Sequence, residues 1–350
     1  MDPSFADTLL VWYHRHKRDL PWRHTQDPYP VWLSEVILQQ TRVDQGIAYY
    51  HRFLQAFPSI QHLALASEEE VLKLWQGLGY YSRARNLHGT AKSVVAQGGF
   101  PKSYRELLAL KGIGPYTAAA ISSFCFKEVQ PVLDGNVFRV FSRMYAVEGS
   151  PDSSVGRAEV MDIAHTLIDA GHPDIFNQAI MEFGALQCTP KNPNCGICPF
   201  QSKCLAFAHQ AVDQFPRPKK KTQVKEISMC FAAVQQDEAL AFIQRKKTGI
   251  WKGLFEFPSV EIDGVLLQED LMSQWFSTWG IDRNSVTVER VSEPIQHVLS
   301  HRKIHAVFMK IQLNTNAIVP EPWVWSSWGE KPFGVSRLVE KGWELFFTHP

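Results

Sequence analysis

The chain has no apolar run that approaches the roughly 18 to 20 residues needed to cross a bilayer. The segment Met1–Arg18 lacks the basic-then-apolar arrangement of a secretory signal peptide. No internal repeat with a period of about 20 to 50 residues is visible, and low complexity is confined to one short tract rich in proline and lysine. These absences argue against a membrane, repeat or disordered protein. We therefore expect a globular, cytoplasmic protein of bacterial type that has no contact with membranes.

Net charge is also small, since 36 Lys and Arg residues stand against 35 Asp and Glu residues and leave a charge of +1. The charge is unevenly distributed along the chain. Residues 1–225 contain 24 basic and 20 acidic side chains, whereas residues 226–350 contain 12 and 15. Any contact with nucleic-acid phosphates is therefore expected mainly in the first part.

A change in hydrophobic pattern divides the chain of 350 residues at the proline-rich tract. From about residue 5 to residue 208, apolar residues recur at three- and four-residue spacing, which predicts successive helices. After the tract, short apolar runs and one helix-like stretch predict an α+β fold. We expect a helical domain at residues 1–212, a linker at 213–226 and an α+β domain at 227–350. The linker is either a plain connection or a contact for a passing duplex. The expected strands include Met229–Val234, Ala239–Ile243 and Ala306–Leu313.

Four of the six cysteines follow the compact pattern Cys188-x6-Cys195-x2-Cys198-x5-Cys204. Such clustering in a chain without a signal peptide favours a metal site over disulfides. Four converging thiolates can hold either a structural zinc ion or a 4Fe-4S cluster. Zinc ribbons usually contain two Cys-x2-Cys pairs separated by a longer stretch. The unequal spacing of the loop 188–204 therefore favours the iron–sulfur cluster.

A glycine-containing turn precedes the cysteines. The segment Leu110–Tyr116 contains Gly112 and Gly114 and leads into an apolar, helix-like stretch. A turn of this kind at a helix N-terminus presents backbone N–H groups to an anion, and the glycines let a DNA phosphate approach closely. By itself the pattern is also typical of a plain loop between helices. Asp134 follows at the end of an apolar segment, where an aspartate most often serves as a helix N-cap.

The order of these features, a hairpin, an aspartate and four cysteines, resembles the layout of the endonuclease III superfamily of helix-hairpin-helix DNA glycosylases. Three segments resemble the MutY-type family of adenine DNA glycosylases within it, namely the signature helix Trp32–Thr41 and the motifs Gly77–Ala84 and Phe176–Ala179. The resemblance covers nearly all of residues 5–210. It implies a monomeric enzyme of base excision repair with a 4Fe-4S subdomain. The implied partner is double-stranded DNA that carries adenine opposite 8-oxoguanine or guanine.

The chemistry of adenine removal calls for two carboxyl groups in different environments. The departing purine must be protonated, and the cationic sugar must be stabilised. Glu35 lies in an apolar helix, where desolvation favours its protonated form, so it is the expected general acid. Asp134 is the expected anion that faces the sugar, with Asn136 beside it as a further catalytic residue. Outside this motif, Glu35 would be interpreted as an ordinary ion-paired helix residue.

Tyr116 bears on the type of glycosylase. In relatives that resemble endonuclease III and also cleave the strand, a lysine at this position forms a Schiff base with the sugar. A phenol has no amine, so we predict a monofunctional glycosylase with Tyr116 in the catalytic pocket. A pyrimidine glycosylase with lyase activity is a rival hypothesis that Tyr116 and the C-terminal extension disfavour. A non-catalytic lesion sensor or nucleotide-binding protein is a second rival, which Glu35 and Asp134 together disfavour.

The resemblance also assigns substrate-binding residues. The adenine pocket would contain Arg18, Leu20, Trp22 and Gln178. Four further substrate-binding residues would be Gln40, Thr41, Leu78 and Tyr80, with Gln40 and Tyr80 beside the oxidised guanine. Of these, Gln40 and Tyr80 match positions that fill the gap left by an extruded base. Two assignments have ordinary alternatives, because Trp22 is also a typical core residue and Tyr80 also suits helix packing.

The second domain resembles the Nudix-like C-terminal domain of the same family, on the segment Gly249–Pro258. It lacks the acidic metal-binding motif of a working Nudix hydrolase, so lesion recognition is expected in place of pyrophosphate hydrolysis. Ser300 and His301 match a loop for oxidised guanine and can donate and accept hydrogen bonds. Leu299 departs from the family pattern, which usually has phenylalanine there.

Overall fold

The structure, a computed structural model, describes residues 4–218, 224–246, 249–314, 320–321, 323–327 and 333–347. It divides into two compact units. The first comprises Met1–Leu65 and Asn86–Lys221, and the second comprises Ala66–Arg85 and Thr222–Pro350. Part of the expected linker, including its lysine run at residues 219–221, lies outside the described residues.

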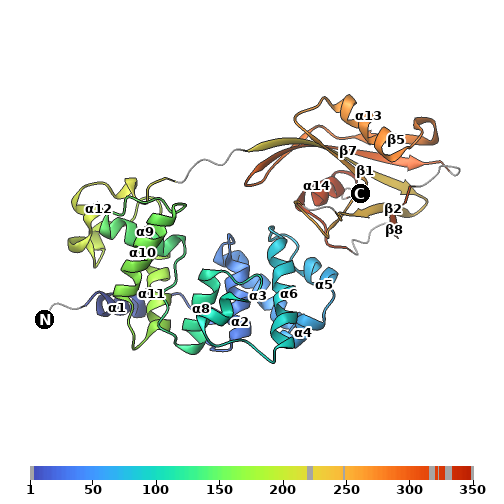
Figure 1. Cartoon of the computed structure of the whole chain (residues 1–350). Helices are drawn as coiled ribbons and strands as arrows, with labels where there is room; N and C mark the ends of the chain where they lie inside the picture. The colour runs from blue at the N-terminus through green and yellow to red at the C-terminus, as the bar shows by residue number, and fades with distance from the viewer. Residues whose placement is uncertain are drawn as a thin grey trace. The chain divides into compact units, whose positions relative to one another are not determined.

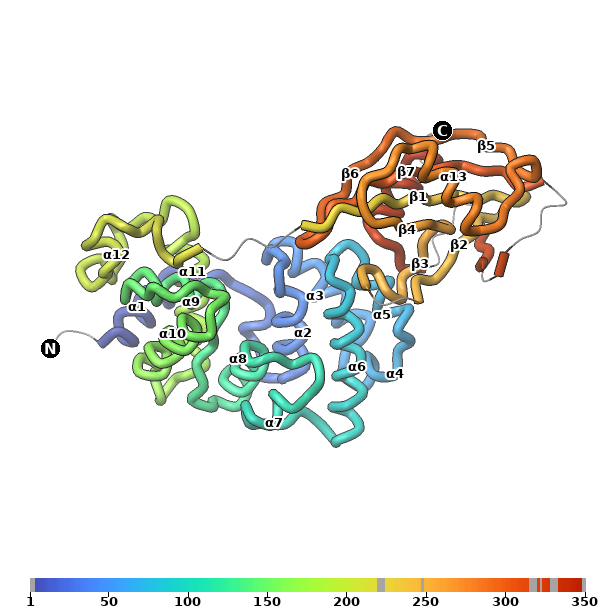
Figure 2. Tube along the Cα trace, turned by 45° about the horizontal axis from the view of Figure 1, so that its top comes forward, coloured from blue at the N-terminus to red at the C-terminus, as the bar shows by residue number. Residues whose placement is uncertain are grey.

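Helices form the regular structure of the chain up to residue 208 within the described range (Figures 1 and 2). They are α1 (Phe5–His16), α2 (Pro28–Leu38), α3 (Val43–Ala56), α4 (Ile60–Leu65), α5 (Glu68–Leu74), α6 (Ser82–Ala96), α7 (Tyr104–Leu108), α8 (Pro115–Phe126), α9 (Gly135–Tyr145), α10 (Ser154–Leu167), α11 (Pro173–Leu186) and α12 (Leu205–Ala208). The prediction of an all-helical first part is confirmed. Among the described residues, no helix combines the length and hydropathy needed to cross a membrane.

Helix α2 begins at a local capping signal. Asp27 caps it by accepting a hydrogen bond from a backbone N–H two residues on (3.0 Å), and Pro28 occupies the first helical position. The helix ends at Leu38, so the prediction of a single helix that extends to Thr41 is wrong. The chain turns at this point because Gln40 adopts a left-handed conformation (φ 57°), and Gln40 is exposed.

Helix α11 contacts three other helices of the first unit. It packs against α1, α8 and α9, while α2 packs against α3 and α8. The core between these helices is aromatic, with Phe141, Phe176 and Phe183 almost fully buried. The close approach of α9 to α11 requires Gly184, since a Cβ there would lie 2.7 Å from the Cβ of Asn136. This packing holds the start of α9 and the C-terminal end of α11 in a fixed relation.

The described part of the second unit contains an eight-stranded mixed sheet. Its strands are β1 (Lys225–Gln236), β2 (Ala239–Gln244), β3 (Phe255–Glu256), β4 (Ser259–Asp263), β5 (Val286–Val291), β6 (Ile295–Val298), β7 (Arg302–Leu313) and β8 (Val324–Ser327). The main path has the order β3-β2-β1-β7-β5, with β4, β6 and β8 paired to β1, β7 and β2. Strands β1 and β7 run parallel, and the other pairs are antiparallel.

Two helices cover opposite faces of this sheet. Alternate residues of β1 point to different cores, with Phe231 on the side of α14 (Arg337–Phe347) and Ala232 on the side of α13 (Gln268–Trp279). Gly342 lets α14 approach the sheet, because a Cβ there would lie 2.2 Å from the ring of Phe308. The prediction of an α+β second part is confirmed, as are the three expected strands and the helix-like stretch.

Candidate active site

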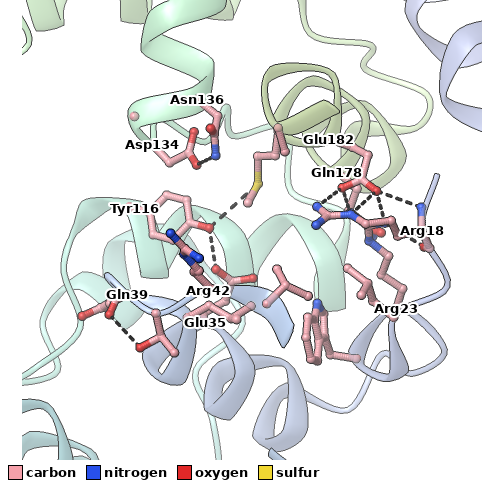
Figure 3. A pocket seen from close by; sticks show the side chains of 18 of the residues that line it. Arg18, Arg23, Glu35, Gln39, Arg42, Tyr116, Asp134, Asn136, Gln178 and Glu182 are labelled. Atoms are coloured by element: carbon pink, nitrogen blue, oxygen red, sulfur yellow. Dashed lines mark hydrogen bonds and ion pairs between the residues drawn. The ribbon is translucent and has the colours of Figure 1, made fainter. Parts of the chain in front are cut away.

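A cavity of about 990 Å³ opens in the first unit, between α2, α8, the start of α9, α11 and the segment that follows α1 (Figure 3). It brings together residues that are far apart in the sequence. The residues expected from the sequence that line it are Arg18, Leu20, Trp22, Glu35, Gln40, Thr41, Tyr116, Asp134, Asn136 and Gln178. Trp22 packs edge-on against Tyr50 and is 8% exposed, so it serves both the core and the cavity wall.

Glu35 and Tyr116 form a hydrogen-bonded pair in this cavity. Glu35 projects from α2 and is 5% exposed, and the hydroxyl of Tyr116 donates to its Oε2 at 2.5 Å. Burial raises the pKa of Glu35 from 4.5 to about 7, and the nearby charge of Asp134 adds to this, while the bond from Tyr116 and the charge of Arg23 oppose it. The carboxyl therefore holds a transferable proton near neutral pH. Burial and the two carboxylates hold the pKa of Tyr116 well above its usual value, so the phenol stays protonated.

Asp134 is the N-cap of α9 as well as a lining residue of the cavity. Its Oδ1 accepts from the backbone N–H of Val137 (2.7 Å), and its Oδ2 accepts from Nδ2 of Asn136 (2.8 Å). Burial raises the pKa of Asp134, and these two hydrogen bonds oppose that rise by favouring the anion. The capping role therefore fixes the carboxylate in place and does not compete with a role in the cavity.

Arg139 connects the turn at Asp134 to the cysteine loop. Its guanidinium donates to Oδ1 of Asn136 (2.9 Å), to the carbonyl of Gly184 (2.7 Å) and to the carbonyl of Cys188 (2.9 Å). Arg139 is 8% exposed. A buried cation with three such acceptors is satisfied, and it makes the orientation of Asn136 depend on the backbone near the first cysteine.

Sequence reasoning missed a second ionic group in the cavity wall. Glu182 on α11 accepts two side-chain hydrogen bonds from Arg18 (2.9 and 2.6 Å) and two from Arg23 (3.2 and 2.9 Å). Burial alone would raise the pKa of Glu182, but these bonds together lower it to about 2. Arg18 is thus held by Glu182 at the edge of the cavity. The signal in the sequence was an acidic residue one helical turn after Gln178, on the same face of the helix.

The four predicted cysteine ligands line one small cavity of the first unit. Short 3-10 helices at Cys195–Ile197 and Gln201–Lys203 turn the chain around it, and the cysteines form no disulfides. Nη1 of Arg143 lies 3.4 Å from Sγ of Cys188. At this distance the positive charge of the guanidinium offsets the negative charge of a thiolate. These residues fit an iron–sulfur cluster. When bound, such a cluster cross-links the loop through iron–thiolate bonds.

The predicted phosphate-binding turn lies between α7 and α8. Gly112 has a left-handed conformation (φ 95°), and a Cβ there would lie 2.9 Å from Oγ1 of Thr90. That hydroxyl donates to the carbonyl of Lys111 (2.6 Å) and braces the turn. Gly114 caps α8, and both glycines are exposed, so the backbone N–H groups at this helix start are accessible to an anion.

The other expected contacts lie outside this cavity, in the second unit. Leu78 is buried, whereas Tyr80 is 45% exposed and has a left-handed backbone (φ 47°). The hydroxyls of Tyr80 and Ser300 share a hydrogen bond of 2.5 Å within this unit. His301 is exposed beside them. Leu299, the residue that departs from the family pattern, packs against the core of the second unit.

Comparison with known families covers both parts of the chain. Residues 33–164 match the family described as HhH-GPD superfamily base excision DNA repair protein, and residues 229–345 match the NUDIX domain. Residues 188–204 match the iron–sulfur binding domain of endonuclease III, so the chain holds a 4Fe-4S cluster in the loop that contains the four cysteines. The chain thus joins a helix-hairpin-helix glycosylase fold to a Nudix-like domain.

Individual relatives agree with these matches. Adenine DNA glycosylase of Rattus norvegicus is 35% identical over 99% of this chain and 78% of the rat protein. Adenine DNA glycosylase of Buchnera aphidicola subsp. Baizongia pistaciae is 36% identical over 86% of this chain and 84% of its own length. Among solved structures, a thermostable thymine-DNA glycosylase is 28% identical and superposes with a TM-score of 0.54 over 59% of this chain and 95% of its own. The chain, with its paired carboxyl groups, its hairpin and its four cysteines, belongs to the adenine DNA glycosylase family.

Proposed function

We propose that the chain hydrolyses the N-glycosidic bond of adenine that is mispaired with 8-oxoguanine or guanine in double-stranded DNA, and that it does not cleave the strand. One observation carries this proposal. A single cavity holds a buried carboxyl group that is protonated near neutral pH, Glu35, and a second carboxyl group stabilised as an anion by two hydrogen-bond donors, Asp134. This is the pair of groups that departure of a purine requires.

The reaction begins when adenine leaves the base stack and enters the cavity. Glu35 transfers its proton to a ring nitrogen of the purine, so that the base departs as a neutral molecule when the bond to C1′ breaks. Asp134 faces the positive charge that develops on the sugar. Water adds to C1′ and gives up a proton, which restores the acid and leaves an abasic site. Asn136 and Arg139 hold Asp134 in position by the hydrogen bonds described above.

The absence of strand cleavage follows from Tyr116. By the family resemblance, this side chain stands where strand-cleaving relatives have a lysine, and its hydroxyl is already engaged by Glu35. A phenol cannot form a Schiff base with the sugar. The abasic product therefore stays unbroken until base or heat is applied.

Recognition of the opposite base is assigned to Gln40, which lines the cavity, and to residues of the second unit. Gln40 is exposed at the turn after α2, and Tyr80 is exposed in the second unit beside Ser300 and His301. Hydroxyl and imidazole groups can donate to or accept from the edge of 8-oxoguanine. The exposed turn at Gly112 would bind the DNA backbone through its N–H groups.

A panel of duplexes tests the activity. Duplexes that carry adenine opposite 8-oxoguanine, guanine, thymine or cytosine are incubated with the protein and then treated with alkali. We expect breaks after alkali opposite the first two partners, none before alkali, and little covalent trapping by borohydride. Efficient trapping or immediate breaks would contradict the monofunctional assignment, and equal cleavage opposite all four bases would contradict the mispair assignment.

Variants at the two carboxyl groups test the roles within the site. Glu35→Gln removes the transferable proton and Asp134→Asn removes the anion, so each should slow excision by on the order of 10² or more. Duplex binding should persist, because phosphate and base-edge contacts set affinity. Glu159→Gln, which changes an exposed carboxyl group of α10, is the matched control. Near-normal turnover by either variant would show that the role given to that carboxyl group is wrong.

A further inference from the structure

Helix α11 carries a stripe of polar side chains at Asp174, Gln178 and Glu182. Residues four apart lie on the same face of a helix. Gln178 and Glu182 both line the active-site cavity, and Figure 3 shows them on the same helix beside Arg18. Both carboxylate oxygens of Glu182 accept hydrogen bonds from Arg18 and Arg23. Of the two stripe residues that line the cavity, Gln178 is therefore the one whose polar group is available to a ligand.

Tyr13 on α1 contacts this stripe from behind the cavity wall. Its hydroxyl donates a hydrogen bond to Oε1 of Gln178 (3.1 Å). Its side chain is buried (4% exposed), and the guanidinium of Arg23 lies 5.6 Å from its ring centroid. Arg23 is itself fixed by its bonds to Glu182. Burial raises the pKa of Tyr13, so the hydroxyl keeps the proton that it donates.

This hydrogen bond selects one of the two senses of the Gln178 amide. In a free glutamine, the oxygen and the NH2 group exchange places when the terminal bond rotates by half a turn. In the reverse sense the NH2 group could donate to the oxygen of Tyr13, but the proton of this buried hydroxyl would then lose its acceptor, Oε1 of Gln178. The sense in which the oxygen faces Tyr13 is therefore favoured. The oxygen keeps a second lone pair, and the NH2 group keeps both of its protons. The amide therefore offers the cavity one acceptor and one donor in a fixed order.

Purines differ in the groups that such an amide would meet. The C6 amino group of adenine donates and the neighbouring ring nitrogen accepts, whereas a 6-oxopurine has an acceptor at C6. A freely rotating amide can turn its oxygen toward a donor or its NH2 group toward an acceptor, so it fits either kind of purine. We propose that Tyr13 is a positioning residue, which fixes the sense of the Gln178 amide and thereby selects 6-aminopurines against 6-oxopurines. The inference rests on the proposed function, because it places the excised base in this cavity.

Replacement of Tyr13 by phenylalanine tests this role. Tyr13→Phe keeps the buried ring and removes only the hydroxyl. Single-turnover rates are measured on duplexes that carry adenine or hypoxanthine at the same position, opposite 8-oxoguanine. Because the amide is then free to rotate, the ratio of the adenine rate to the hypoxanthine rate should fall by about fivefold, the effect of one hydrogen bond of ordinary net strength.

Tyr29→Phe is the matched control. The hydroxyl of Tyr29 is equally buried and donates to the carbonyl of Phe57 (2.7 Å), away from the cavity. Its loss should lower the midpoint of thermal unfolding and leave the ratio of the two rates unchanged. An equal fall of the ratio in both variants would overturn the proposal, because it would then reflect a general loosening of the fold.

A double variant shows whether Tyr13 acts through the amide. In the Gln178→Leu background there is no amide to orient, so addition of Tyr13→Phe should leave the ratio as it is in Gln178→Leu alone. A further fall, or an unchanged ratio in folded Tyr13→Phe, would overturn the proposal. The wild-type reaction is scored separately. Absence of adenine excision by the wild type contradicts the proposed function, whereas normal excision with an unchanged ratio contradicts only the role of Tyr13.

Discussion

Replacement of Glu35 by glutamine should make the protein more stable, and the gain should grow with pH. A rise in the pKa of this carboxyl group from 4.5 to about 7 corresponds to roughly 3 kcal/mol. As pH rises through this window, the unfolded chain loses the proton before the folded chain does, so the wild-type protein loses stability. Glutamine is neutral at every pH and can still accept the hydrogen bond from Tyr116. The variant therefore escapes this loss.

The size of the effect can be followed along the pH scale. The variant should exceed the wild type by roughly 1 kcal/mol at pH 5 and by roughly 3 kcal/mol at pH 8, where the buried carboxyl group is ionised. For a unit of this size, each kcal/mol moves the unfolding midpoint by roughly 2 to 4 °C. The midpoint at pH 8 should thus rise by roughly 6 to 12 °C. Other titrating groups are common to both proteins, so their contributions cancel in the difference.

Thermal unfolding without DNA measures this difference. Circular dichroism and the visible absorbance of the cluster are recorded from pH 5 to pH 8.5. All scans use one heating rate, because the midpoint depends on heating rate when unfolding is irreversible. Glu159→Gln is the control and should change stability by less than about 0.5 kcal/mol at each pH. Equal midpoints for Glu35→Gln and the wild type at pH 8, or a difference that shrinks as pH rises, would refute the argument from burial.

Three further variants test other parts of the site. Tyr116→Phe removes a donor that favours the ionised form of the glutamate it contacts, so the pH at which excision slows should move upward, and a downward move in the pH–rate profile would contradict this. Gly184→Ala places a methyl group 2.7 Å from the Cβ of Asn136, so it should cost about 1 to 3 kcal/mol of stability and slow excision. Gly89→Ala is the control, because the space around its Cβ is open, and it should lower neither stability nor the rate of excision. Cys198→Ser should lose iron and visible absorbance, and retention of a full complement of iron by metal analysis would exclude Cys198 as a ligand.

The sequence by itself determined the class of each part of the chain. Apolar residues at three- and four-residue spacing define helices whatever their partners are, and the runs that became β1, β2 and β7 are apolar and strand-like. The spacing of the cysteines also indicated the metal-binding loop 188–204. The proposed catalytic residues were predicted because they lie in motifs that resemble a known family, and the structure brings two of them, Glu35 and Tyr116, into contact.

Only the tertiary structure decided how these groups act on one another. The pKa of Glu35 depends on how deeply α2 is buried and on Asp134, which is about a hundred residues away in the sequence. The ion pairs of Glu182 also depend on packing, because its arginine partners come from the segment after α1. The hydrogen bond between Tyr13 and Gln178 likewise joins two different helices. Local patterns predict which residues form a helix because backbone geometry is local. Burial, charge and hydrogen-bond order arise between helices, and only their packing fixes them.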